Sequence, residues 1–286
     1  MSALRRTSGW WQAPAALLVA ALFIAPMVWM AAASLKPNAR IHRDVDSLRS
    51  FLPEPFTLEN YSAALARSHL GTTLVNTLVV VVVIAGLGVL VNGAAAFAFA
   101  RLSFRGRDWL FGILVASIIL PIEVIVIPLF MTVRTSAFAM DYLGERPWTL
   151  AALSLPFAAK AFNIFLLRQH FLSHPRALEE AALLDGAGWI TVFWRIALPN
   201  AKPALVTVVL LDFVVHWNDF LWPLVVCQGQ DTRTVQLGMG NFFTQPPISW
   251  GAILAYALLI TAPLTLAFAV GQRWLAKSIA TSGLRG

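Results

Sequence analysis

The sequence LVVVVVI, from Leu78 to Ile84, lies within a long stretch that has no charged residue and extends between Arg67 and Arg101. A second charge-free stretch separates Arg6 from Lys36. A helix needs about 20 consecutive, mostly apolar residues to cross the hydrocarbon core of a bilayer. Each stretch is long enough for one such helix, so the sequence predicts a membrane protein built from helices.

The composition of the whole chain supports this class. The 286 residues are 58% hydrophobic and only 12% charged, whereas soluble domains average about 45–50% apolar and about 25% charged residues. The net charge is +7, but the basic residues lie in short tracts between apolar blocks, so no nucleic-acid partner is predicted. Cys227 is the only cysteine, which excludes an intrachain disulfide and a cysteine metal cluster.

The apolar blocks predict an all-α polytopic membrane protein with six transmembrane helices in one transmembrane domain, residues 1–286. The first span is read as an uncleaved helix rather than a secretory signal, because it is longer than a signal core and five more spans follow. The predicted spans are residues 13–35, 73–100, 109–133, 148–172, 203–227 and 251–272.

The distribution of basic residues predicts which ends of the spans face the cytoplasm. With both termini inside, the inner tracts hold 12 basic residues and the outer loops hold 8, with Lys160 left within a span. Inner loops of membrane proteins carry the excess of Lys and Arg, so both termini are predicted to be cytoplasmic. The inner basic residues are Arg5, Arg6, Arg101, Arg105, Arg107, Arg168, Arg176, Arg195, Lys202, Arg273, Lys277 and Arg285.

The inner connection between the fourth and fifth spans, residues 173–202, carries the most specific pattern. It reads EAALLDG from Glu180 to Gly186, then nine residues, then IALP from Ile196 to Pro199. Pro175 suits the first turn of a helix, and Gly186 and Gly188 interrupt it. A short helix, a turn and an aromatic helix are predicted, which would dock into a groove on a soluble partner. The alternative is a helix that lies on the lipid headgroups.

This spacing, E-A-A-x3-G-x9-I-x-L-P, resembles the signature of importer permeases driven by ATP-binding cassettes. From Lys36 to the C-terminus the chain resembles the maltose-type sugar-importer permease family, specifically its shorter second permease. The segments that carry the resemblance are Lys36-Pro37, Asn60-Tyr61, Asn76-Thr77, Phe162–Arg168, Trp217–Leu224, Gly271–Arg273 and Gly283–Gly286.

The resemblance implies a type I ABC importer permease fold in the bacterial plasma (inner) membrane, with a cytoplasmic coupling helix. It implies a heterodimer with a second permease, two copies of an ATP-binding cassette ATPase, and an extracellular or periplasmic solute-binding protein that delivers a sugar or oligosaccharide. The residues that would couple to the ATPase are Glu179, Glu180, Ala181, Ala182, Leu184, Asp185 and Gly186.

The chain itself is predicted not to be an enzyme. It has no glycine-rich phosphate loop that ends in Gly-Lys-Ser or Gly-Lys-Thr, so ATP and Mg would be bound by the partner ATPase and this chain would carry no cofactor. The histidines lack metal-ligand spacing, and no set of nucleophile, base and acid is recognisable.

Ionisable residues inside spans are costly and are candidates for function. Glu123 and Lys160 are predicted to lie at similar depth, about 21 Å and about 18 Å from the inner face at the helical rise, and to pair or to share a polar cavity. Asp212, His216 and Asp219 follow i, i+4, i+7 spacing on the fifth span and would share one helix face. Together with Asn218 they could line a translocation path or form a buried packing face.

Three other functions compete with sugar import. A glycerol-phosphate or other phosphorylated-solute importer is suggested by Leu120–Val124, which resembles that branch, and by Lys160, which would attract an anion if it were unpaired. A proton-coupled secondary carrier would use Glu123, Asp212 and His216, but it would not need the docking segment. A membrane enzyme ranks last because no catalytic set is recognisable.

Overall fold

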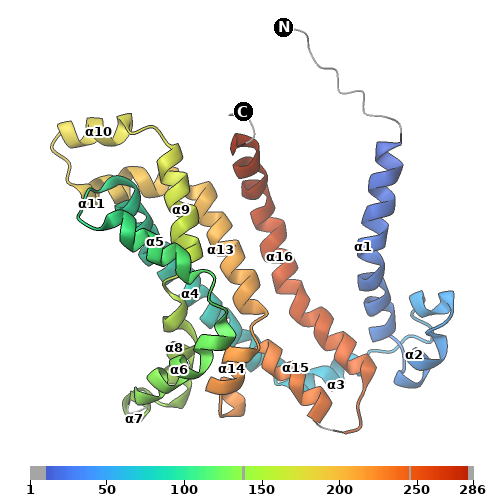
Figure 1. Cartoon of the computed structure of the whole chain (residues 1–286). Helices are drawn as coiled ribbons and strands as arrows, with labels where there is room; N and C mark the ends of the chain where they lie inside the picture. Colours follow the sequence, from blue (N-terminus) through green and yellow to red (C-terminus); the bar gives the residue numbers. More distant parts are fainter. Residues whose placement is uncertain (1–10, 137–138, 245, 283–286) are drawn as a thin grey trace. The chain divides into compact units, whose positions relative to one another are not determined.

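The computed structural model describes residues 11–136, 139–244 and 246–282, and these residues form helices and loops without a strand (Figure 1). The α-helices of the first half are α1 (Gln12–Ser34), α2 (Asn38–Asp44), α3 (Glu59–Ser68), α4 (Leu70–Arg101), α5 (Arg107–Ser117), α6 (Ile122–Thr135), α7 (Met140–Leu143) and α8 (Glu145–Ser154). Those of the second half are α9 (Ala161–Ser173), α10 (Ala177–Leu184), α11 (Trp189–Val192), α12 (Leu198–Asn200), α13 (Lys202–Trp217), α14 (Leu221–Val226), α15 (Val235–Thr244) and α16 (Trp250–Ser282). The shorter turns are η1 (Leu48–Phe51), η3 (Leu155–Phe157), η4 (Phe193–Ala197) and η5 (Gln230–Thr232).

Within the described part of the chain, three helices are long and apolar enough to cross a membrane: α1, α4 and residues Trp250–Gln272 of α16. Three bent pairs also pass the test of length and composition, which gives up to six spans if each pair is one span. The bends are 104° between α5 and α6, 50° between Glu145–Phe157 and α9, and 76° between Trp189–Asn200 and α13.

Breaks in the helices separate the predicted third, fourth and fifth spans into shorter helices. Leu120 precedes Pro121, where the proline ring disfavours a helical backbone, and α6 begins only at Ile122. In the predicted fourth span the chain leaves the helix after Phe157 and resumes at Ala161. In the predicted fifth span α13 ends at Trp217 and α14 begins at Leu221. Asp219 therefore lies outside α13, and the predicted helical stripe consists of Asp212 and His216 only.

The described residues form two compact units, one from residues 11–70 and the described part of 239–261, the other from the described part of 71–238 and residues 262–282. In the first unit, the segment that follows α1 is fixed by buried polar groups. Asn60 donates from Nδ2 to the backbone oxygens of Ser34 (2.8 Å) and Lys36 (2.6 Å), and Nζ of Lys36 pairs with Asp44 at 3.1 Å. The resemblance at Lys36 and Asn60 thus corresponds to one buried polar anchor.

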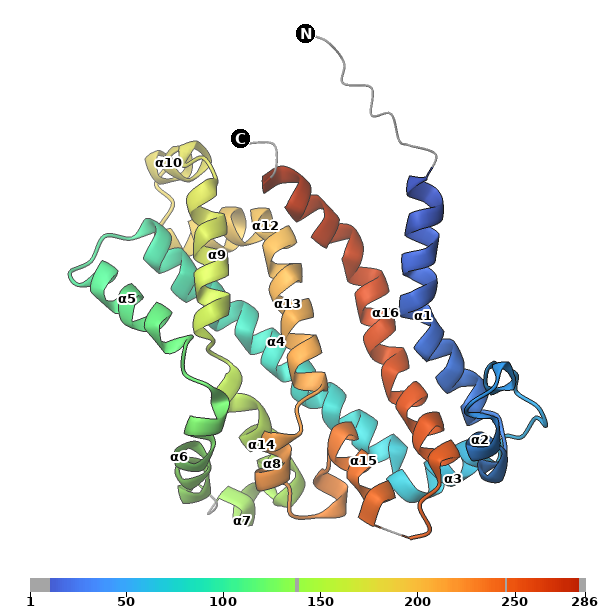
Figure 2. The ribbon, with the colours of Figure 1, turned by 45° about the vertical axis from the view of Figure 1, so that its right-hand side comes forward.

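In the second unit, α4 passes through two hydrophobic clusters. The first cluster joins α4 to α9, to residues of α11 and η4, and to α13, and its central side chains include Phe97, Leu167 and Val208. The second joins α4 to α6, α8 and α14 through residues that include Ile84 and Trp222. Figures 1 and 2 both show α9 beside α13, with α10 beyond the end of α9. The α10 segment therefore lies near the end of α4 that belongs to the first hydrophobic cluster.

Polar contacts secure the other end of α4. Asn76 donates from Nδ2 to the backbone oxygens of Asp231 (2.8 Å) and Arg233 (2.9 Å). Its Oδ1 accepts from Nε (3.1 Å) and Nη2 (2.9 Å) of Arg146, and the Thr77 hydroxyl accepts from the backbone N–H of Val235 at 2.9 Å. The Asn76-Thr77 pair therefore holds α8 and the loop before α15 against α4.

Candidate functional site

The segment predicted to couple to a partner forms helix α10, a turn and a second helical stretch from Trp189 to Asn200. The helix begins at Ala177, two residues after Pro175, and ends at Leu184. Gly186 has φ +85°, its N–H donates to Leu183 O (3.1 Å), and the N–H of Ala187 donates to Ala182 O (2.9 Å). These two bonds form a Schellman motif, which needs a left-handed residue at the Gly186 position.

Helix α10 has one exposed face and one face turned inward. Ala182 and Leu183 pack against the first hydrophobic cluster, and Glu179 is buried. The residues exposed on the other face and in the turn are Leu178, Glu180, Ala181, Leu184, Asp185 and Gly186. Five of the seven residues predicted to couple are therefore available to a partner, whereas Glu179 is buried and Ala182 is half-buried.

Glu179 forms an ion pair with Arg101, the last residue of α4. Nε of Arg101 lies 2.6 Å from Oε2 of Glu179, and the two side chains are 2% and 8% exposed. Nη2 of Arg101 also donates to the backbone oxygen of His174 at 3.1 Å. Glu179, one of the residues predicted to couple to the ATPase, thus points toward the body of the protein, where it anchors α10 to the end of α4.

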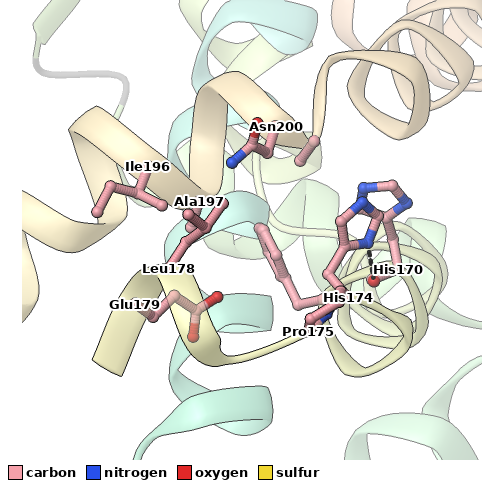
Figure 3. Close-up of a pocket in the computed structure, with 10 residues that line it drawn as sticks. His170, His174, Pro175, Leu178, Glu179, Ile196, Ala197 and Asn200 are labelled. Carbon is pink, nitrogen blue, oxygen red and sulfur yellow. Dashed lines mark hydrogen bonds between the residues drawn. The ribbon is translucent and has the colours of Figure 1, made fainter. Parts of the chain in front are cut away.

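A cavity of about 250 Å³ lies beside this ion pair, between α10, the end of α9 and the stretch that precedes α13 (Figure 3). It is lined by His170, Phe171, His174, Pro175, Leu178, Glu179, Ile196, Ala197, Asn200 and Ala201. The rings of His170 and His174 lie 4.3 Å apart at their centroids. The cavity therefore borders the buried Arg101–Glu179 contact that attaches α10 to α4.

The helical stretch after the turn contains a π-helical turn from Phe193 to Ala197, just before Pro199. A proline ring in a helix clashes with the carbonyl four residues earlier, here that of Arg195, and a wider turn relieves that clash. Val192 and Phe193 are buried in the first cluster, while Ile190 is exposed. The predicted aromatic helix is therefore present, with its Phe193 side packed inward.

We expect the substitution Gly186→Ala to lower the free energy of unfolding by about 1–2 kcal/mol, because a side chain at positive φ is strained. Gly188→Ala is the matched control, since Gly188 has φ −79° and a Cβ at either glycine would meet nothing within 4 Å. Thermal unfolding in detergent, followed by tryptophan fluorescence, measures both variants. Equal midpoints for the two would contradict the assignment of strain to Gly186.

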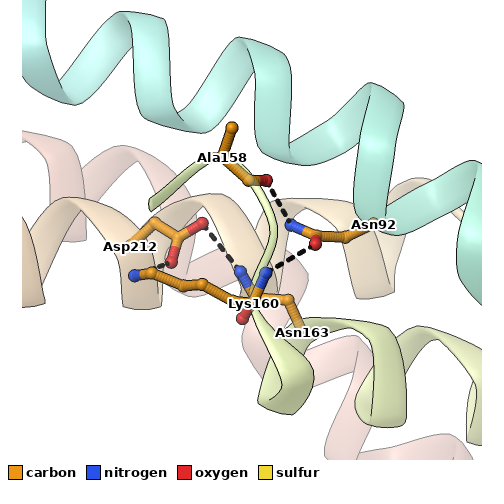
Figure 4. A network of polar contacts seen from close by, with 5 residues as sticks. All are labelled: Asn92, Ala158, Lys160, Asn163 and Asp212. Atoms are coloured by element: carbon orange, nitrogen blue, oxygen red, sulfur yellow. Dashed lines mark hydrogen bonds and ion pairs between the residues drawn. The ribbon is translucent and has the colours of Figure 1, made fainter. Parts of the chain in front are cut away.

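A second polar cluster lies where α4, α9 and α13 approach one another (Figure 4). Nζ of Lys160 lies 2.7 Å from Oδ1 of Asp212, with side-chain exposures of 20% and 3%. Asn163 donates from Nδ2 to the other carboxylate oxygen of Asp212 at 2.9 Å. The carboxylate of Asp212 therefore joins α13 to the start of α9, and the ion-pair partner of Lys160 is Asp212, not the predicted Glu123.

Asn92 of α4 caps the break before α9. Its Oδ1 accepts from the backbone N–H of Lys160 at 2.9 Å, and its Nδ2 donates to the backbone oxygen of Ala158 at 3.3 Å. A break in a helix frees backbone groups that hydrocarbon cannot satisfy, and neighbouring side chains must bond them. Asn92 supplies both a donor and an acceptor, and so makes the break before α9 compatible with a membrane span.

The other predicted pathway residues are placed as follows. Glu123 lies exposed in the first turn of α6. His216 is buried, and its ring lies 5.1 Å from that of Phe157. Asn218 donates to Val214 O at 2.8 Å, and Asp219 accepts from the N–H of Trp222 at 3.4 Å. Asn218 and Asp219 therefore bond backbone groups at the break between α13 and α14.

Sequence reasoning did not select Asn92, Asn163 or Arg101 as functional candidates. An amide within the charge-free stretch that contains Asn92 is a usable signal, because a polar group in an apolar span needs a partner. Arg101 was visible only as one member of a basic tract. Among the residues that the structure describes, no group of three or more His, Cys, Asp or Glu side chains is placed to hold a metal ion.

The chain is similar in sequence to permease proteins of sugar transport systems. The chain is 30% identical over 274 residues to the diacetylchitobiose uptake system permease protein NgcG of Streptomyces coelicolor, covering 94% of this chain and 86% of that one. It is 27% identical over 269 residues to the arabinooligosaccharides transport system permease protein AraQ of Halalkalibacterium halodurans, covering 94% and 93%.

A crystal structure of a bacterial ABC transporter involved in the import of the acidic polysaccharide alginate contains a chain of the same fold. The TM-score is 0.74 at 23% identity, over 96% of this chain and 98% of the other. The likeness shows that the two chains share one fold.

A family model matches residues 87–281. This range includes the Arg101–Glu179 ion pair, the Lys160–Asp212 ion pair and the whole α10 segment. Its description is binding-protein-dependent transport system inner membrane component. This protein belongs to that family, and it is a non-catalytic, helical permease component of an inner-membrane ABC transport system.

Proposed function

We propose that the chain is a permease subunit that imports a sugar or oligosaccharide, delivered by an extracellular solute-binding protein and driven by an ATPase on separate chains. The observation that carries the proposal is the exposed face of α10, where Leu178, Ala181 and Leu184 stand beside Glu180 and Asp185. An apolar helix face with an acidic border suits a groove on a soluble protein. It suits an anionic lipid surface poorly.

The proposed assembly contains a second permease, in a heterodimer, and two copies of the ATPase, which bind ATP and Mg. Both termini and α10 face the cytoplasm, and the end of α4 that holds Asn76 faces outward. The excess of basic residues in the inner tracts supports this orientation. The buried contacts of Asn76 with η5 and α8 support a fixed outer surface for the solute-binding protein.

The charge balance inside the second unit favours a neutral solute over an anionic one. Lys160 is compensated by Asp212 at 2.7 Å, so this lysine supplies no net positive charge for a phosphate group. Two relatives are named for the transport of diacetylchitobiose and of arabinooligosaccharides. Both observations support a sugar as the solute and argue against the glycerol-phosphate reading.

Uptake by the reconstituted importer tests the proposal. The chain, its partner permease, the ATPase and the solute-binding protein are placed in proteoliposomes with ATP inside. Labelled diacetylchitobiose, arabinooligosaccharides and glycerol 3-phosphate are offered outside with the binding protein. We expect ATP-dependent uptake of a sugar. Uptake driven by a proton gradient without ATP would establish a secondary carrier instead, and uptake of glycerol 3-phosphate alone would establish the phosphorylated-solute alternative.

A further inference from the structure

The ion pair between Arg101 and Glu179 is a buried polar contact that joins α4 to α10. The guanidinium of Arg101 and the carboxylate of Glu179 approach to 2.6 Å, and both are almost fully buried. A second bond from Arg101 reaches the backbone oxygen of His174, just before α10. Arg101 therefore holds α10 through both its first turn and the chain that leads into it. A planar guanidinium with several donors fixes orientation as well as distance.

The surroundings make this contact important for the position of α10. Ala182 and Leu183 supply small or partly buried apolar contacts to the first cluster. On the other side, a cavity of about 250 Å³ lies between Leu178 and Glu179 of α10 and the end of α9. Apolar contacts are non-directional, whereas a buried ion pair is directional. Arg101 and Glu179 therefore supply a directional contact between α10 and α4.

The two residues connect the two surfaces that the proposed function requires. The exposed face of α10 would meet the ATPase, while α4 runs from Arg101 through both hydrophobic clusters to Asn76 at its other end. When α10 moves, α4 moves by the same amount only if the contact between the two helices is rigid. Coupling between distant sites is carried by such packed elements and ion-pair networks.

We propose that Arg101 and Glu179 are positioning residues for energy coupling, which make α10 and α4 move as one body when the ATPase acts. The inference rests on the proposed function, since it requires an ATPase seated on α10. It assigns to Glu179 a role different from that of its neighbour Glu180: Glu180 faces the partner, and Glu179 transmits the partner's movement inward.

The test measures solute uptake and ATP hydrolysis together in proteoliposomes that contain the full importer, with the sugar that the wild-type system takes up. We expect Glu179→Gln and Arg101→Gln to lower the number of sugar molecules imported per ATP hydrolysed by about tenfold. The ATPase should remain bound to the permeases. We expect the double variant to lose no more than either single variant, because both changes disrupt one interaction.

Asp108→Asn is the matched control, because it removes the acid of an exposed ion pair, Arg107–Asp108 at 3.0 Å, and it should leave the ratio unchanged. If the single variants fold poorly, Arg101→Met combined with Glu179→Met removes both buried charges while filling the space, and its ratio decides the question. A wild-type ratio in these variants would overturn the inference. Failure of the wild-type chain to bind an ATPase would instead overturn the proposed function.

Discussion

Replacing Asp212 by asparagine is expected to lower the free energy of unfolding by about 3–5 kcal/mol, the usual cost of removing one partner of a buried ion pair. The variant keeps an oxygen that can accept from Asn163, but it leaves the ammonium of Lys160 without its counter-charge at 2.7 Å. An uncompensated charge within a membrane span is costly. Resistance to unfolding by heat and by denaturing detergent measures the effect.

The double variant Lys160→Met with Asp212→Asn is expected to recover most of the lost stability, because neither charge remains. Its transport activity then separates the two interpretations of the cluster. Normal uptake by the stable double variant would show that the ion pair is a packing device and does not bind solute. If Asp212→Asn alone unfolds at the wild-type midpoint, Lys160 does not depend on Asp212 and the assigned ion pair is wrong.

Replacing Leu184 by aspartate is expected to weaken binding of the ATPase by about 100-fold, with little effect on the permease itself. The Leu184 side chain is 89% exposed at the end of α10, so the substitution removes no packing within this chain. A few side chains that become fully desolvated near the centre of an interface account for most of its binding energy, and a buried charge without a partner there is costly. An aspartate at that position would be buried next to Glu180 and Asp185 without a counter-charge of its own. Titration of the purified permease pair with the ATPase measures the affinity.

Leu48→Asp provides the matched control, since Leu48 is 87% exposed and belongs to η1, in the segment predicted to lie outside the membrane on the opposite side. It should bind the ATPase with wild-type affinity. Equal affinities for the Leu184 and Leu48 variants would mean that α10 is not the docking surface. The alternative of a helix lying on lipid headgroups would then account better for its exposed leucines.

The sequence by itself determined the class of the protein and the location of the α10 segment, which is proposed to dock on the ATPase. Charge-free stretches such as the one around Leu78–Ile84 reveal helical spans. A helix that crosses the hydrocarbon core must be mostly apolar over about 20 residues, whatever the tertiary structure. The segment from Glu180 to Pro199 is specified by local rules as well: a positive φ is readily available to glycine, so Gly186 marks the end of α10 in the sequence.

Only the tertiary structure decided which charges meet and where the spans break. The spacing that placed Glu123 and Lys160 at similar depth assumed two straight helices, whereas the helices bend by 104° and 50° and Lys160 pairs with Asp212. Glu179 and Glu180 are adjacent acids in one helix turn, and only the structure shows that the first pairs with Arg101 at the end of α4. Sequence spacing fixes a side chain's direction around its own helix, but its partner is supplied by a helix distant in the chain.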